Sequence, residues 1–317
     1  MDPEAFFRRS TVLFVAGKGG VGKSTTTAVI ALAAARCGLR VLAVELEGRS
    51  ELPRALGLDG ELDWDERLAV ALPSGGTVTA RRIRPDDALI EWLRAHTLGA
   101  VVKRLRGSGA LEVVSFAIPG IREVLVLGKL KAVERDGGFD LIVVDAPATG
   151  HAITLLTSPA GLASAARGGA VRRQAEEVVE LLADPARCRV LLVALPRELA
   201  VDETIEAAYE VEDRAGVTLS DVVVNQYRPP EPALAARLLP ADAAPLGASL
   251  AASVESARSF EWAREQSEAT EVARLAARLP LRVLALPPID APRLGPDEAD
   301  ALASSLLASI LSMEAEP

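Results

Sequence analysis

The stretch Ala16-Gly17-Lys18-Gly19-Gly20-Val21-Gly22-Lys23-Ser24-Thr25 is a glycine-rich loop between two apolar segments. Residues 12–15 before it are apolar, and residues 26–36 after it are rich in alanine, with aliphatic side chains at helical spacing. Between a strand and a helix, the pattern G-x-x-x-x-G-K-[ST] predicts a phosphate site built from backbone N–H groups and a helix N-terminus. The predicted binding residues are Gly17, Gly19, Gly20, Val21, Gly22, Lys23, Ser24 and Thr25.

Three side chains of this loop are candidates for chemistry. Lys23 can neutralise the outer phosphates of a nucleotide, and the Ser24 hydroxyl can ligate Mg²⁺. Lys18 comes directly after the first glycine and cannot fold back easily onto phosphates that its own loop holds. A solvated loop lysine remains the alternative interpretation of Lys18.

A second polar segment follows an apolar strand predicted at 141–144, and it reads Asp145-Ala146-Pro147-Ala148-Thr149-Gly150-His151. An aspartate that closes such a strand is the position that holds Mg²⁺ in P-loop ATPases, so Asp145 is predicted as a metal residue together with Ser24. Gly150 can donate a backbone N–H to the γ-phosphate, which would let the nucleotide order this segment. For His151, a sensor of that movement and an ordinary packed or solvated histidine both stay open.

The base of the nucleotide is predicted to lie beside Asn225, which ends a strand at 221–224. Its amide offers both a donor and an acceptor to the edge of adenine. A guanine site would need N-K-x-D, and residue 228 is arginine, so the sequence favours ATP over GTP. Pro287, after the last predicted strand at 281–286, is expected beside the adenine.

These motifs resemble a known family. The variant G-K-G-G-x-G-K-[ST] resembles the deviant Walker A motif of the ArsA, MinD and nitrogenase iron protein group. Residues 145–151 resemble the D-T-A-P-T-G-H switch of the ArsA and tail-anchored-protein targeting ATPases. The resemblance implies two chains that face each other across sandwiched nucleotides, with Lys18 of each reaching into the partner's site.

The resemblance also assigns a role after the strand predicted at 40–44, where the sequence is Glu45-Leu46-Glu47-Gly48-Arg49-Ser50. There Glu47 takes the place of an aspartate that positions the attacking water in the family. One extra methylene displaces the carboxylate, and a shift of about 1 Å can cost on the order of 100-fold in rate. Weak hydrolysis is therefore expected, and a solvated loop acid remains the alternative. This switch is similar to that of one member of the paired ArsA-like ATPases of actinobacteria.

The composition excludes several classes of protein. A formal net charge of −9 over 317 residues argues against nucleic acid as the main partner. No apolar run approaches the roughly 20 residues that span a bilayer, and the start of the chain lacks the basic region of a signal peptide. Only Cys37 and Cys188 occur, which indicates a reducing compartment, a cytoplasmic location and no thiolate site for arsenite or zinc. A helix predicted from Pro296 is acidic, which excludes a basic membrane-targeting tail.

The alternation of strands and helices predicts an α/β fold, a doubly wound and mainly parallel sheet of the P-loop NTPase type. One domain is expected over 1–317, with a helical insertion at roughly 85–135 and 152–185. Residues 77–83 alternate like an edge strand, 203–204 would open a helix, 229–248 would form a surface loop, and 256–278 would be helical.

Residues 119–123 resemble the start of the insert that carries cargo in the targeting ATPase. The only methionines are Met1 and Met313, so a methionine-lined cargo groove is not expected.

Two hypotheses follow. In the first, the chain is an ATPase with ATP and Mg²⁺ as cofactors, with Lys18, Lys23, Glu47 and Asp145 as catalytic residues. It would work as a homodimer or as a heterodimer with a paralogous ArsA-like ATPase. In the second, it is a weakly hydrolysing, nucleotide-gated regulatory subunit of such a heterodimer. The cargo has no signal in the sequence.

Overall fold

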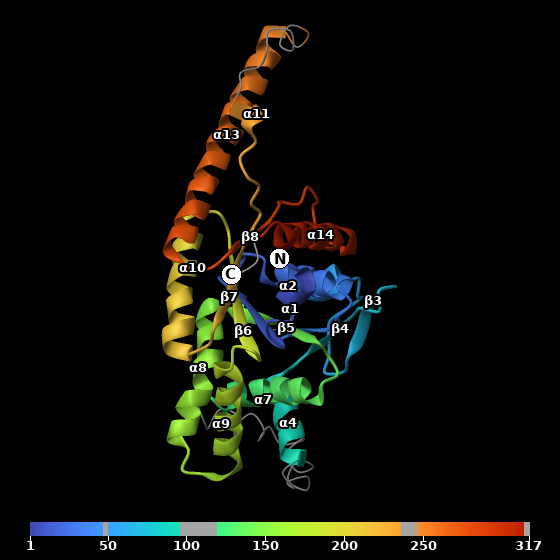
Figure 1. Ribbon diagram of the computed structural model, residues 1–317, viewed down its shortest axis with the longest axis vertical. Coiled ribbons are helices and arrows are strands. Elements are labelled where there is room, and N and C mark those ends of the chain that lie inside the picture. The colour runs from blue at the N-terminus through green and yellow to red at the C-terminus, as the bar shows by residue number, and fades with distance from the viewer. Residues whose placement is uncertain (47–49, 96–118, 236–244, 246, 314–317) are drawn as a thin grey trace.

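The structure is a computed structural model that describes residues 1–46, 50–95, 119–235, 245 and 247–313. Its centre is an eight-stranded sheet with the order β3-β4-β2-β5-β1-β6-β7-β8 (Figure 1). All neighbouring strands pair in parallel except β3 and β4. The strands are β1 (Val12–Gly17), β2 (Arg40–Glu45), β3 (Arg67–Ala71), β4 (Thr77–Arg82), β5 (Leu141–Ala148), β6 (Cys188–Ala194), β7 (Leu219–Asn225) and β8 (Val283–Leu286).

Helices cover both faces of this sheet, which confirms the predicted doubly wound α/β fold. One face packs against α1 (Pro3–Phe7), α2 (Lys23–Arg36), α3 (Leu52–Ala55) and α14 (Pro296–Ser312). The other face packs against α7 (Ile121–Asp136), α8 (Thr149–Ala165), α9 (Gly169–Ala183), α10 (Glu198–Tyr209), its π-helical continuation (Glu210–Ala215) and the end of α13 (Gly247–Arg278). The central strands read as continuous apolar runs because both of their faces are buried.

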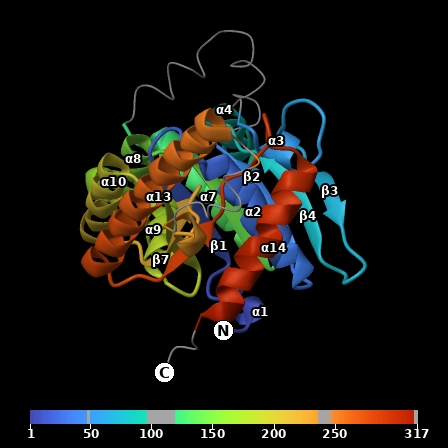
Figure 2. The ribbon, with the colours of Figure 1, turned by 90° about the horizontal axis from the view of Figure 1, so that it is seen from above.

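The helix that follows the glycine loop is unusually enclosed. Ten of the fourteen residues of α2 are buried, because it lies between the sheet and α14. Alanine is the common residue there, since a small side chain lets the packed elements approach closely. Figure 2 shows α14 beside α1, so the first and the last helix of the chain lie together on one side of the molecule. The loop at the head of α2 is therefore fixed to a rigid core.

Four helices gather below the sheet in the view of Figure 1: α4 (Pro85–Ala95), α7, α8 and α9. All four contribute to a separate apolar cluster that includes Leu89 and Leu93 of α4, Val124 and Leu125 of α7, Leu162 of α8 and Ala175 of α9. These helices overlap the helical insertion predicted at roughly 85–135 and 152–185, although α8 begins earlier, at Thr149, and that division of the chain stays a prediction. Within the described residues, no helix combines the length and the apolarity needed to cross a membrane.

The structure corrects several expected elements. Residues 77–83 do not form an edge strand, because β4 lies between β2 and β3. The edge is β3, which has no clear alternation and exposes Leu68. The helix expected to open at 203–204 begins at Glu198. Part of the expected surface loop at 229–248 is helical, since α11 (Pro232–Ala235) lies in it and α13 begins nine residues before position 256, at Gly247.

The two cysteines are free thiols, with Cys37 partly buried at the end of α2 and Cys188 in β6. Cys188 is buried at the start of β6, and burial raises the pKa of its thiol to about 12. A thiol with such a pKa stays protonated near neutral pH and behaves as a small apolar side chain.

Candidate functional site

The glycine loop turns from the carboxyl end of β1 into α2, as predicted. Gly20 and Gly22 have φ of 83° and 96°, in the left-handed region that favours glycine. A Cβ on Gly22 would lie 2.2 Å from Nδ2 of Asn225, and one on Gly17 would lie 2.5 Å from the carbonyl oxygen of Val193. Glycine at 17 and 22 therefore lets the loop pass close to the ends of β6 and β7.

The two lysines of the loop have different partners. Nζ of Lys23, the first residue of α2, donates to the carbonyl oxygen of Lys18 at 3.2 Å. The ammonium of Lys18 instead forms an ion pair of 2.9 Å with Glu203 of α10. Lys18 is 54% exposed and Glu203 is 25% exposed, so this pair lies at the surface.

The two predicted metal residues are in contact. Oγ of Ser24 donates to Oδ2 of Asp145 at 2.6 Å, although 121 positions separate them in the sequence. Asp145 lies opposite Val15 of β1 and Glu45 of β2 in the parallel register, and it is 6% exposed. A hydroxyl and a carboxylate at the mouth of a phosphate loop are hard oxygen donors of the kind that Mg²⁺ prefers, so the residues present fit this ion.

Comparison with known proteins agrees with this geometry. Residues 10–168, about half of the chain, match the family described as anion-transporting ATPase, ArsA type. The chain belongs to this family. It is 36% identical to ATPase BagA of Mycobacterium tuberculosis over 222 residues, which is 68% of this chain and 64% of that protein. It is 29% identical to ATPase get3 of Schizosaccharomyces japonicus over 153 residues, or 48% of this chain and 45% of that protein. The match to BagA thus spans less than two thirds of that protein.

Asn225, the predicted adenine contact, is hydrogen-bonded to the backbone of the glycine loop. Its Nδ2 donates to the carbonyl oxygen of Val21 at 2.9 Å, and its Oδ1 accepts from the N–H of Gln226 at 3.0 Å. Asn225 is 5% exposed. Position 225 pairs with Leu286 at the end of β8, one residue before Pro287. The two predicted base contacts therefore lie at neighbouring strand ends, and one of them, Asn225, contacts the loop.

The second predicted switch, residues 145–151, runs from β5 into α8. Gly150 lies in the first turn of α8, where backbone N–H groups lack partners within the helix. The exposed His151 lines a cavity of about 150 Å³ together with Leu46, Arg122 and Pro147. This cavity adjoins both predicted switch segments, through Leu46 and Pro147, and the start of α7.

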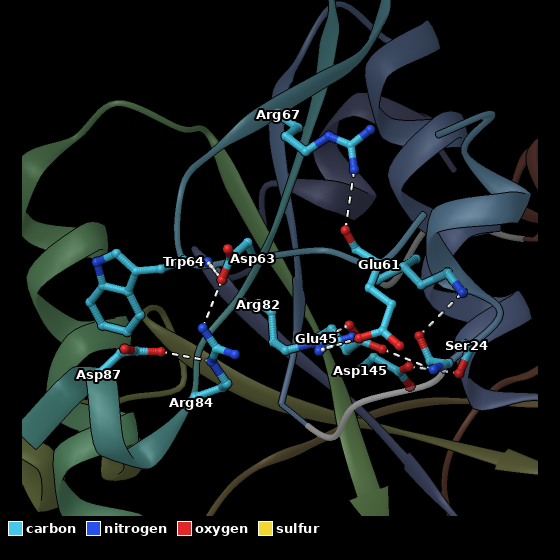
Figure 3. A network of polar contacts seen from close by, with 12 residues as sticks. Ser24, Glu45, Glu61, Asp63, Trp64, Arg67, Arg82, Arg84, Asp87 and Asp145 are labelled. Carbon is cyan, nitrogen blue, oxygen red and sulfur yellow. Dashed lines mark hydrogen bonds and ion pairs between the residues drawn. The ribbon is translucent and has the colours of Figure 1, made fainter. Parts of the chain in front are cut away.

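A buried ion pair at the end of β2 had no clear signal in the sequence. Glu45 is fully buried, and its Oε2 accepts from Nε of Arg82 at 2.8 Å. Its Oε1 accepts from the N–H of Ser50 at 2.9 Å, which ties together the two ends of the segment that carries Glu47. Glu61 pairs with Arg82 from the outside at 3.1 Å. Figure 3 shows this network beside Ser24 and Asp145. Glu47 itself lies outside the described residues.

The buried pair leads to a prediction about stability. Replacing Arg82 by methionine should lower the free energy of unfolding by about 3–5 kcal/mol, because it leaves the Glu45 carboxylate buried without its cation. Arg84→Met is the control, since Arg84 pairs with Asp63 and Asp87 at the surface, and it should cost under about 1 kcal/mol. Urea unfolding of both variants measures the difference. Equal losses of unfolding free energy in the two variants would show that the buried pair contributes no more to stability than the surface pairs.

Proposed function

We propose that the chain is an Mg²⁺-dependent ATPase whose nucleotide state controls a partner or cargo. The observation that carries this proposal is the 2.6 Å contact between Ser24 and Asp145, next to a glycine loop with Lys23 at its helix N-terminus. Loop, lysine, hydroxyl and carboxylate are the parts from which P-loop enzymes build phosphoryl transfer. Family membership and the ATPases among its relatives support the same activity.

Each part has a role in this proposal. The backbone N–H groups of the loop bind the phosphates, and Lys23 leaves the Lys18 carbonyl to contact the outer phosphates. Ser24 and Asp145 would hold Mg²⁺, which when bound neutralises charge on the phosphate oxygens. The N–H of Gly150 contacts the γ-phosphate, so residues 145–151 respond to its presence. Asn225 and Pro287 flank the adenine, which selects ATP over GTP.

The proposed active form is a dimer. Lys18 completes the nucleotide site of the facing chain, in keeping with the resemblance to the deviant Walker A group. The second chain is either a further copy or a paralogous ArsA-like ATPase. The acidic net charge speaks against nucleic acid as that partner, and nothing in the sequence identifies the cargo.

The test of this proposal is the rate of ATP hydrolysis by variants of Glu47. The isolated chain should hydrolyse ATP slowly, because the Glu47 carboxylate is displaced by one methylene from the place of the family's aspartate. Glu47→Asp should raise turnover or leave it similar, whereas Glu47→Ala should lower it by about 10-fold or more while sparing the affinity for ATP. Steady-state turnover and calorimetric titration separate the two effects.

Two results would contradict the assignment. Unchanged turnover in Glu47→Ala would make Glu47 a solvated loop acid. Tight, Mg²⁺-dependent ATP binding without measurable turnover in either the wild type or Glu47→Asp would favour the regulatory subunit over the enzyme.

A further inference from the structure

The ion pair between Lys18 and Glu203 has a consequence for the proposed dimer, on which this inference rests. We propose that Glu203 is a positioning residue for Lys18. In the single chain it directs the lysine away from its own phosphate loop, and it releases the lysine when a second chain presents its nucleotide. The nucleotide of the facing chain is thus the competing partner for the Lys18 ammonium.

The backbone around the pair is well fixed on the side of Glu203. Its neighbours Val201, Thr204 and Ile205 are buried, and Oγ1 of Thr204 donates to the carbonyl oxygen of Ala200 at 2.7 Å. The helix face that presents Glu203 therefore has one defined position. Lys18 is the more exposed partner, because its long side chain starts from an exposed loop residue.

The acids close to Glu203 in the sequence do not replace it. Asp202 pairs with Arg274 of α13 at 2.5 Å. Glu206 is exposed on the same helix and belongs to no ion pair found among the described residues. Glu203 is therefore the carboxylate that holds Lys18, at 2.9 Å.

The size of the effect expected from this ion pair follows from the exposure of its two side chains. An ion pair of two partly exposed side chains shifts an equilibrium by about 1.5- to 5-fold. Such a contact does not block the lysine, because the phosphates of a facing nucleotide offer several negative charges in its place. The ion pair must break before the dimer closes, so it raises the protein concentration needed for closure. Removing the pair should lower that concentration by the same factor.

The first measurement uses the isolated chain. An amine-reactive reagent followed by mass spectrometry gives the labelling rate of Lys18. Glu203→Gln should raise this rate by about 2- to 5-fold, since the ammonium loses its partner. Glu206→Gln, with the same charge change on the same helix, should leave it unchanged. Equal rates in the two variants would overturn the inference, whatever the oligomeric state.

The second measurement follows nucleotide-dependent self-association by sedimentation, with Mg²⁺ and a non-hydrolysable ATP analogue. Glu203→Gln should reduce the protein concentration at half-association by about 2- to 5-fold, with unchanged affinity for the analogue in calorimetry. In a Lys18→Ala background the same substitution should have no effect. An effect that persists there, or one matched by Glu206→Gln, would overturn the inference. A wild-type chain that never self-associates would instead refute the proposed homodimer, and the labelling result would still decide the role of Glu203.

Discussion

Replacing Lys23 by alanine should weaken the binding of ATP by about 100-fold or more. The ammonium of Lys23 contacts the carbonyl oxygen of Lys18 at 3.2 Å at the head of α2, within reach of phosphates held by the loop. A hydrogen bond to a charged group contributes about 1.5–3 kcal/mol, and a lysine that contacts two phosphates makes more than one. Calorimetric titration with Mg²⁺ and ATP measures the loss directly.

A matched control keeps this result specific. Lys129 of α7 pairs with Glu91 at 2.7 Å in the helical region, away from the loop. Lys129→Ala should bind ATP as the wild type does. Titration of the wild type with GTP tests Asn225 in the same series, and a comparable affinity for GTP would contradict the adenine contact. Equal ATP binding by Lys23→Ala and the wild type would remove the proposed nucleotide site.

Lys18→Ala should lower turnover by about 10³-fold or more while leaving ATP affinity close to that of the wild type. A cation that enters the facing site in trans acts like an arginine finger, which is worth roughly 10³ to 10⁵ in rate. Affinity should be spared because Lys18 pairs with Glu203 in the single chain and is proposed to contact only the nucleotide of the facing chain. Turnover of the wild type should rise with protein concentration until the dimer is saturated.

Mixing two inactive variants gives the decisive control. Lys18→Ala still binds ATP but donates no lysine, whereas Lys23→Ala, at ATP concentrations too low to fill its weakened site, holds no ATP but still donates Lys18. In an equal mixture about half of the dimers are mixed, each with one complete site, so activity should return to about a quarter of the wild-type level. Activity that survives Lys18→Ala and ignores protein concentration would mean a self-contained site in one chain.

The central elements of this fold could be predicted because each has a local signal. Apolar runs of four residues mark the central strands. The aspartate that follows one of these runs, Asp145, was predicted as a metal residue together with Ser24, and the two side chains are in contact. The family resemblance then assigned roles to Lys18 and Glu47, which their spacing in the sequence alone could not do. Because Glu47 lies outside the described residues, its role remains a prediction.

Other features depend on which strands and helices meet, and the sequence pattern does not contain that information. β4 looked like an edge strand because its residues alternate, but alternation does not show whether a further strand pairs beyond it. Glu45 and Arg82 each end a strand without any motif, and only the parallel register brings them together. The pairing of Lys18 with Glu203 likewise needs the contact between a loop and a helix that begins 180 positions later, at Glu198.

The position of Asn225 has a consequence for how the nucleotide is bound. One buried amide contacts the backbone of the phosphate loop and also lies where the base is proposed to bind. In the proposed site the base and the triphosphate would therefore share a structural element, and we expect their contributions to affinity to depend on each other. Substitutions at Asn225 and in the loop should then be non-additive, because residues that share a partner are energetically coupled. Discrimination between bases in this chain would in part be a property of the phosphate loop.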